Sequence, residues 1–202
     1  MLILKNLGMN TIRLRAWVNP ASGWSNKADL VSKALRAKNF GLRVMIDFHY
    51  SDTWADPGHQ TKPAAWTSQD FATLKMSLSN HTTDVLNELK NNGAKWDVVG
   101  MSLYPTAGNW STLNSQCLSN MNDMVTRYNK EVIVVEVGMS WDQPGEENAF
   151  LSDLIAKTKL VTGNKGLGVL YWEPESYNNW QGYTLGAFDN SGKPTVALNA
   201  FN

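Results

Sequence analysis

The sequence lacks most of the features that would assign it to a compartment or to a charged partner. It has one cysteine, Cys117, so no disulfide can form within the chain, and the redox compartment stays open. No apolar run approaches the roughly 20 residues that a membrane helix needs. Basic and acidic residues number 18 each, without a block of either sign. Nucleic acid and anionic membrane surfaces are therefore not expected partners.

Common cofactor and nucleophile motifs are also absent. There is no glycine-rich phosphate loop and no Gly-x-Ser-x-Gly turn. The histidines, His49, His59 and His81, are too scattered to predict a zinc site, and His81 is expected on the surface of a helix. We therefore expect no cofactor. Met1 to Gly8 reads as the end of an amphipathic helix capped by Gly8, and no signal peptide is visible.

Tryptophan, by contrast, is abundant, with nine residues. Its flat apolar ring with a polar edge suits the faces of sugar rings, and it also fills protein cores. Composition alone favours the core role.

Strand-like and helix-like segments alternate along the chain, which predicts parallel strands with crossover helices. The expected strands are 11–18, 42–50, 96–104, 132–137 and 167–172. The expected helices are 27–40, 68–91 (with Ser68 as the N-cap), 112–128 and 146–162, and one more short helix is expected after Thr195.

Strand polarity favours a (β/α)8 barrel over a doubly wound sheet. Each of the first three strands has one apolar face, while the other face becomes polar toward the carboxyl end. Barrel active sites lie at such strand ends. The side chains expected there are Arg15, Asp47, His49, Ser102, Tyr104, Glu136 and Trp172. A complete barrel needs roughly 250 residues, so five strands in 202 residues predict an incomplete one.

Glu136 is the leading catalytic candidate, because it is a carboxylate near the end of an apolar strand. A buried charge is costly unless it is paired or has a chemical task. One interpretation is a structural glutamate satisfied by an arginine. The other is a glycosidase nucleophile kept ionised by its neighbours, with Arg15 and Tyr104 as plausible companions.

Asp47 and His49 lie two residues apart and therefore share one face of their strand. They are expected to form a structural network, to bind substrate hydroxyls, or both. In the loop that follows, Asp52 and Asp56 either cap turns or face the mouth, and Trp54 is either a stacking platform or a loop anchor.

The last predicted strand ends in Tyr171-Trp-Glu-Pro. Trp172 is a candidate floor for a sugar site, and Glu173 and Glu175 are further carboxylates near the mouth.

Five stretches, in this order, resemble glycoside hydrolase family 53, the arabinogalactan endo-β-1,4-galactanases. They are Asn10-Thr-Ile-Arg-Leu-Arg-Ala-Trp, Asp47-Phe-His-Tyr-Ser-Asp-Thr-Trp-Ala-Asp-Pro, Gly100-Met-Ser-Leu-Tyr-Pro, Val134-Val-Glu-Val-Gly and Tyr171-Trp-Glu-Pro. The second stretch is long and specific, and the similarity covers nearly the whole chain. The segments that begin at Trp141 and Asn178 look most like those of bacterial members.

The resemblance implies a secreted enzyme, extracellular or periplasmic, that hydrolyses galactan or arabinogalactan through two glutamates in a retaining mechanism. Such a pair lies about 5–5.5 Å apart. Glu136 matches the family's nucleophile. The expected substrate-binding residues are Arg15, Asp47, His49, Asp52, Trp54, Tyr104, Trp172 and Glu173.

The family's acid/base glutamate lies in a Gly-Asn-Glu motif that this sequence does not contain. The first, fourth and fifth family strands also have no counterpart, which places a deletion junction near residues 92–96 of a single, incomplete barrel domain. Asn87-Glu88 lies in a predicted helix and is a poor substitute.

Three alternatives therefore stay open: an inactive galactan-binding remnant, protonation by Glu173 or Glu175, and a different barrel glycosidase. Asp142, Glu146 and Glu147 form a weak acidic cluster that leaves a structural calcium ion possible.

Overall fold

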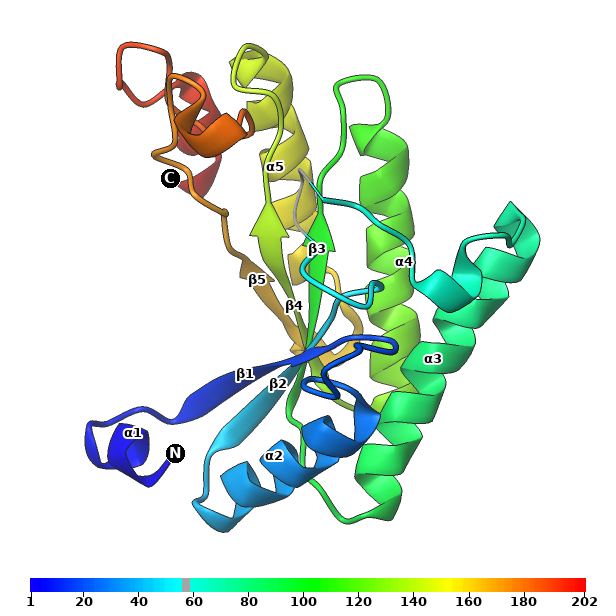
Figure 1. The fold of residues 1–202 in the computed structure, drawn as a ribbon. Coiled ribbons are helices and arrows are strands. Elements are labelled where there is room, and N and C mark those ends of the chain that lie inside the picture. Colours follow the sequence, from blue (N-terminus) through cyan, green and yellow to red (C-terminus); the bar gives the residue numbers. More distant parts are fainter. Residues whose placement is uncertain (56–58) are drawn as a thin grey trace. The chain divides into compact units, whose positions relative to one another are not determined.

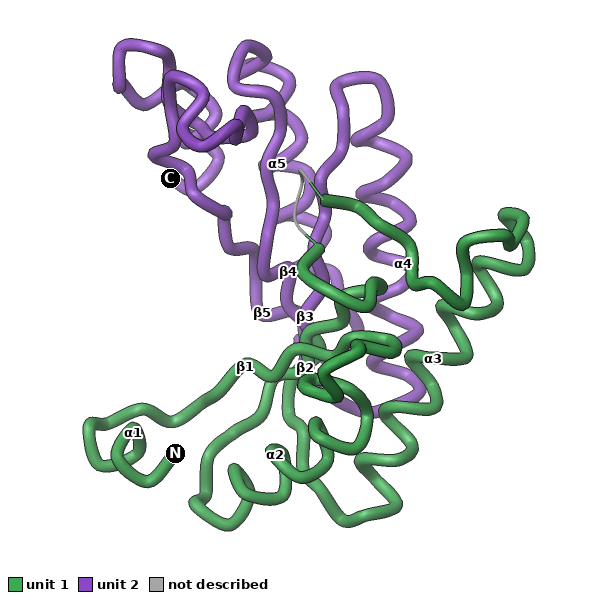
Figure 2. The backbone as a smooth tube through the Cα atoms, in the orientation of Figure 1, with its two compact units in different colours: residues 1–99 green, residues 100–202 purple. Residues whose placement is uncertain are grey.

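The computed structural model describes residues 1–55 and 59–202, so Asp56 and Pro57 of the second stretch lie outside the described residues. The chain forms two compact units, residues 1–99 and 100–202 (Figure 2). Five parallel strands follow one another in the order β1-β2-β3-β4-β5, and β3 (Val98–Leu103) begins in the first unit and continues into the second.

The first unit contains one parallel strand pair and its crossover helix. Thr11 to Ala16 of β1 run beside Arg43 to Phe48 of β2, with Arg15 opposite Asp47. Helix α2 packs on both strands and on α3. The elements are α1 (Leu2–Asn6), β1 (Thr11–Ala16), α2 (Lys27–Asn39), β2 (Arg43–Phe48), η1 (Ala64–Trp66) and α3 (Phe71–Asn91).

Local side-chain chemistry sets the ends of these helices. The Asn26 side chain accepts a hydrogen bond from the Asp29 amide at the start of α2, and Gly41 follows its end with φ +67°. Helix α3 begins after Asp70, whose carboxylate accepts from the Thr73 amide at 2.8 Å. The predicted cap at Ser68 was therefore wrong, because Asp70 supplies the acceptor that the first turn needs.

The core of the first unit is the apolar strand face that the sequence predicted. Leu14 and Ala16 of β1 and Val44 and Ile46 of β2 are buried. Helices α2 and α3 bury their own apolar side chains in this unit, namely Leu30, Val31, Ala34, Ala37, Val85, Leu86 and Leu89.

The second unit packs α4 and α5 against parallel strands (Figure 1). Val132 and Val134 of β4 pair with β5, and Phe150, Leu151 and Leu154 of α5 are fully buried. The elements are α4 (Trp110–Tyr128), β4 (Glu131–Val137), α5 (Pro144–Lys159), η2 (Thr162–Asn164), β5 (Gly166–Val169), η3 (Trp180–Gly182) and η4 (Val196–Phe201).

The predicted alternation of strands and helices is confirmed, with boundaries shifted by a few residues. All five strands occur in the predicted order, and the short helix after Thr195 is the 3-10 helix η4. Among the described residues, no helix has both the length and the apolar character needed to cross a bilayer.

The sequence predicted that His81 lies on the surface of a helix, but in the structure this residue is half-buried among aromatic rings. Its ring lies about 6 Å from the rings of Phe48, Tyr50 and Trp66. Its Nε2 atom is buried, with no hydrogen-bond partner in residues 1–55 and 59–202. Burial among these rings lowers the pKa of His81 below its ordinary value. The folded state therefore holds His81 neutral.

We expect acid to destabilise the native protein more than a His81→Phe variant. A depressed folded-state pKa gives stability that is complete above the ordinary histidine pKa of about 6.5 and is lost as pH falls below it. Thermal unfolding at pH 7.5 and pH 5 measures the difference. Equal pH dependence in the two proteins would contradict this account.

Candidate active site

Glu136 lies beside two hydroxyl groups from the neighbouring strand. Ser102 Oγ donates to Glu136 Oε2 at 3.2 Å, and the Tyr104 hydroxyl donates to the same oxygen at 3.4 Å. Ser102 is on β3 and Tyr104 just follows it, and residues two apart share one face of a strand. The predicted companionship of Tyr104 with Glu136 is confirmed. The sequence placed Ser102 at the strand end without giving it a role.

These two hydrogen bonds orient the Glu136 carboxylate. Burial, followed by the negative charge of Glu136, raises the pKa of Tyr104 far above its ordinary value. Tyr104 therefore keeps its proton and remains a donor at any working pH. Arg15, the other predicted companion, belongs to the first unit, and its contact with Glu136 stays a prediction.

A second glutamate, Glu147, lies buried in the same unit. It is fully inaccessible, and its Oε1 accepts from the Met139 amide at 3.1 Å and from the Tyr171 hydroxyl. Glu147 Oε2 has no hydrogen-bond partner among the residues that the structure describes. Burial raises the pKa of Glu147 to about 7, against the opposing effect of these two donors.

The three acidic residues of the possible calcium cluster do not form a ligand set. Glu146 accepts from Trp110 Nε1 at 2.9 Å, Asp142 is exposed, and Glu147 is buried beside Tyr171. Adjacent helix residues point about 100° apart, so Glu146 and Glu147 face different surroundings. Nowhere in residues 1–55 and 59–202 do three histidine, cysteine or acidic side chains converge on a possible metal.

In the first unit, Asp47 is buried with two cationic or hydrogen-bonding partners. Arg13 forms an ion pair with Asp47 Oδ2 at 2.7 Å, and His49 Nε2 lies 2.8 Å from the same oxygen. Burial acts to raise the pKa of Asp47, but the His49 hydrogen bond and the Arg13 charge outweigh it and hold the pKa below its usual range. The structural-network interpretation therefore applies. The sequence identified His49 and missed Arg13.

Arg15 instead takes part in an aromatic group at the end of β1. Its guanidinium carbon lies 3.5 Å from the Trp54 ring centroid and 5.0 Å from that of Trp17. The Trp17 and Trp54 rings meet edge to face at 5.9 Å. These cation–π contacts position Trp54, which is still 58% exposed.

Asp52 holds two loop segments together. Its carboxylate accepts from the Asn19 amide at 2.8 Å and from the Ala64 amide at 2.9 Å. This arrangement matches the turn-capping interpretation of the sequence. Both carboxylate oxygens already have backbone donors, so a contact with substrate would add to a structural role.

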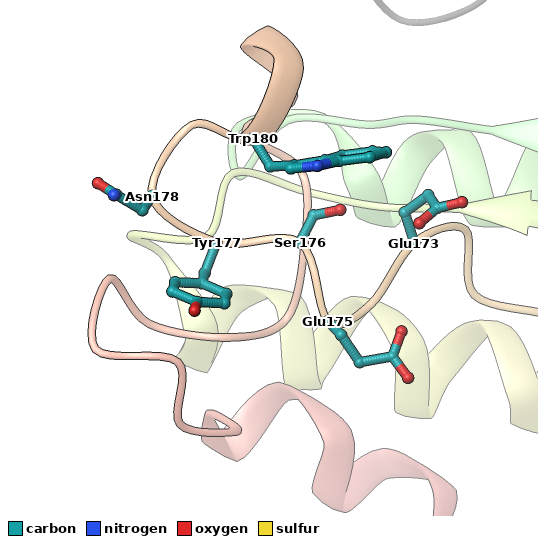
Figure 3. Close-up of a pocket in the computed structure, with 6 residues that line it drawn as sticks. All are labelled: Glu173, Glu175, Ser176, Tyr177, Asn178 and Trp180. Carbon is teal, nitrogen blue, oxygen red and sulfur yellow. The ribbon is translucent and has the colours of Figure 1, made fainter.

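A cavity of about 380 Å³ lies in the loop after β5 (Figure 3). Glu173 and Glu175 line one end and Tyr177 and Asn178 the other. Glu173 and Asn178 have positive φ values of +47° and +52°, which cost energy in non-glycine residues and cluster at functional loops. Trp172 does not line this cavity, but its side chain is 40% exposed.

The model of glycosyl hydrolase family 53 matches residues 1–95 and 87–201. The chain belongs to this family. The resemblance read from the five stretches is thereby confirmed, and the chain is a glycosidase by family.

Named relatives agree with this assignment. The arabinogalactan endo-β-1,4-galactanase of Thermothelomyces thermophilus is 29% identical over 300 positions, which cover 98% of this chain and 89% of that protein. A probable arabinogalactan endo-β-1,4-galactanase A of Neosartorya fischeri is 33% identical over 183 positions, which cover 84% of this chain and 51% of that protein. The first alignment is much longer than this chain of 202 residues, so about a third of its positions have no counterpart here.

Solved structures support the fold. An exo-β-1,3-glucanase from Aureobasidium namibiae matches with a TM-score of 0.55 at 9% identity, over 94% of this chain and 65% of that one. An endo-1,4-β-xylanase from Caldicellulosiruptor owensensis matches with a TM-score of 0.54 at 14% identity, over 85% and 52%. With the family assignment, these matches confirm the α/β fold of a barrel glycosidase, with five strands in the described part of the chain.

We expect Asp47→Asn to lower the free energy of unfolding by about 1–3 kcal/mol, because it leaves part of a buried ion pair uncompensated. Asp123→Asn is the matched control. Asp123 pairs with Arg127 on an exposed helix face, where such pairs contribute roughly 0.3–0.5 kcal/mol. Urea unfolding of both variants checks the difference. Equal losses of unfolding free energy in the two variants would show that the Asp47 network stabilises the first unit no more than an exposed ion pair does.

Proposed function

We propose that this chain is an endo-acting glycoside hydrolase directed at β-1,4-galactosidic bonds of galactan or arabinogalactan, with Glu136 as its nucleophile. The observation that carries the proposal is a carboxylate near the end of β4 that two hydroxyl donors orient through one oxygen. Family membership and the names of the relatives supply the substrate class.

Glu136 would act by attack on the anomeric carbon. The carboxylate forms a bond to that carbon while the bond to the glycosidic oxygen breaks, and water then hydrolyses the glycosyl-enzyme. Ser102 and Tyr104 hold the carboxylate in place for this attack.

The protonation of the leaving group is the weak step of this chain. The sequence contains no Gly-Asn-Glu motif, and Glu88 of the Asn87-Glu88 pair lies in α3, where its carboxylate accepts from Asn92 Nδ2 at 2.9 Å. Glu88 therefore binds the residue that ends its helix. Loss of general acid catalysis costs about 10²–10⁴-fold in rate. We propose that the family nucleophile persists here while cleavage of natural galactan is slow.

Exposed tryptophans and loop carboxylates would bind the sugar. We assign Trp54 and Trp172 as stacking surfaces and Glu173 as a hydroxyl acceptor, from their exposure and from the cavity of Figure 3. Arg15 would support Trp54. In this proposal the main role of Asp47, His49 and Asp52 is to stabilise the chain segments that carry them. Binding of substrate hydroxyls is their second role.

The expected place of action follows from the substrate. A pectin-type polysaccharide is met outside the cell, so we propose an extracellular or periplasmic location. We also propose that the whole chain is one incomplete barrel domain. Its deletion junction would lie near residues 92–96.

The function is tested with two substrates of different leaving-group chemistry. We expect slow release of reducing ends from linear β-1,4-galactan and much faster cleavage of 2,4-dinitrophenyl β-galactobioside, because dinitrophenolate leaves without a proton. Glu136→Gln should abolish both activities. Glu88→Gln, the matched control, should change neither.

Three outcomes would contradict the proposal. Cleavage of neither substrate, with galactan still bound, would favour the binding remnant. Galactan cleavage lost in Glu173→Gln or Glu175→Gln alone would mean that this carboxyl has become the general acid. A preference for another polysaccharide would assign a different barrel glycosidase.

A further inference from the structure

Trp172, one of the two stacking surfaces assigned above, lies beyond the regular part of the sheet. Strand β5 ends at Val169, and the pairing of β4 with β5 shifts in register between Val132 and Val134. The residue after Trp172, Glu173, has a positive φ of +47°. Regular strand pairing therefore does not fix this tryptophan, and contacts outside the ladder must hold it.

Both backbone polar groups of Trp172 have partners within the second unit. Its amide donates to the Val137 carbonyl at 3.1 Å, and Val137 directly follows Glu136 in β4. Its carbonyl accepts a hydrogen bond from the Tyr183 hydroxyl at 3.2 Å. The first contact ties Trp172 to the strand that carries Glu136. The second orients the planar peptide group that follows Trp172.

The segment that carries Tyr183 is itself attached to the chain that follows β4. The Trp141 amide donates to the Thr184 carbonyl at 3.1 Å. Tyr183 is half-buried, and its hydroxyl also lies 3.4 Å from the Leu185 carbonyl oxygen. One hydroxyl shared between the carbonyls of Trp172 and Leu185 therefore links the two sides of the loop after β5.

The close approach of Tyr183 depends on a glycine at the end of β4. A Cβ atom at Gly138 would lie 2.7 Å from the Leu185 carbonyl oxygen and 3.0 Å from the Tyr183 hydroxyl. The first contact is to the backbone, so turning a side chain would not relieve it. Any larger residue at position 138 would have to displace residues 183–185 from the strand. The missing side chain thus leaves the Tyr183 hydroxyl within reach of Trp172.

We propose that Tyr183 is a positioning residue for Trp172, and that Gly138 provides the space that this role requires. The hydroxyl of Tyr183 holds the backbone of Trp172 in the conformation that presents its ring to the sugar. A ring that is ordered before binding loses less freedom on binding, so it binds more tightly. The inference rests on the proposed function, which assigns Trp172 as a stacking surface.

The test follows the Trp172 ring by ¹⁹F NMR of protein labelled with 5-fluorotryptophan. The chain has nine tryptophans, and the Trp172→Phe spectrum assigns the resonance. In Tyr183→Phe we expect this resonance to shift or broaden without sugar, because the hydroxyl that orients its backbone is gone. Half-saturation of its response to β-1,4-galactotetraose should need about 3- to 10-fold more sugar than in the unmodified protein.

Tyr50→Phe is the matched control. Tyr50 is also half-buried, and its hydroxyl is hydrogen-bonded to Thr82 Oγ1 at 2.9 Å in the first unit. Each variant loses one tyrosine hydroxyl, but only Tyr183→Phe should alter the Trp172 resonance and its half-saturation. Gly138→Ala keeps the Tyr183 hydroxyl and should alter both readouts, because the added methyl group displaces the segment that carries it.

The proposal would be overturned if Tyr183→Phe left either readout unchanged, or if Tyr50→Phe changed both to the same extent. A Trp172 resonance that does not respond to galactotetraose in the unmodified protein would also overturn it. None of these measurements requires turnover at Glu136. Failure to cleave 2,4-dinitrophenyl β-galactobioside would therefore contradict the proposed nucleophile and leave the positioning of Trp172 intact.

Discussion

The cost of placing carboxyl groups among apolar strands is the constraint on which this structure depends. Desolvation favours the neutral form of any buried acid unless donors or cations compensate. Three carboxyl groups of this fold have three different surroundings. Asp47 is buried beside Arg13 and His49, Glu136 is half-buried beside two hydroxyls, and Glu147 is buried with a raised pKa that lets it bind a proton.

These three solutions correspond to three different roles. The Asp47 pair is an electrostatic clamp that stabilises the first unit and leaves little freedom for chemistry. Ser102 and Tyr104 donate neutral hydrogen bonds to Glu136, which orient a carboxylate without neutralising it. Glu147 is neither clamped by a cation nor exposed, and its Oε1 accepts from the Met139 amide and the Tyr171 hydroxyl. The environment of each carboxyl, rather than its residue type, therefore determines what it does.

The sequence predicted the elements well because period-two strands and capped helices are local signals. It also identified Glu136, Tyr104, Asp47 and His49 from their places at the ends of strands. It missed Arg13 as the partner of Asp47, because the diagonal contact across two paired strands depends on register rather than on spacing within one strand. It grouped Glu147 with its acidic neighbours, since only tertiary packing shows that this helix residue faces Tyr171.

The chain belongs to family 53, and its sequence contains no Gly-Asn-Glu motif. In our proposal it keeps the nucleophile of the family and lacks the general acid. About a third of the positions in the alignment with the Thermothelomyces thermophilus galactanase have no residue in this chain. What remains in the second unit is a carboxylate with its orienting hydroxyls and an adjoining loop cavity.

Covalent trapping is the most direct test of the central claim that Glu136 is a competent nucleophile. The reagent is a 2,4-dinitrophenyl 2-deoxy-2-fluoro-β-galactobioside, which needs no acid to leave and forms a slowly hydrolysed glycosyl-enzyme. Intact-mass measurement followed by peptide mapping should find one added glycosyl group, on Glu136. An unlabelled protein, or a label on another residue, would contradict the account.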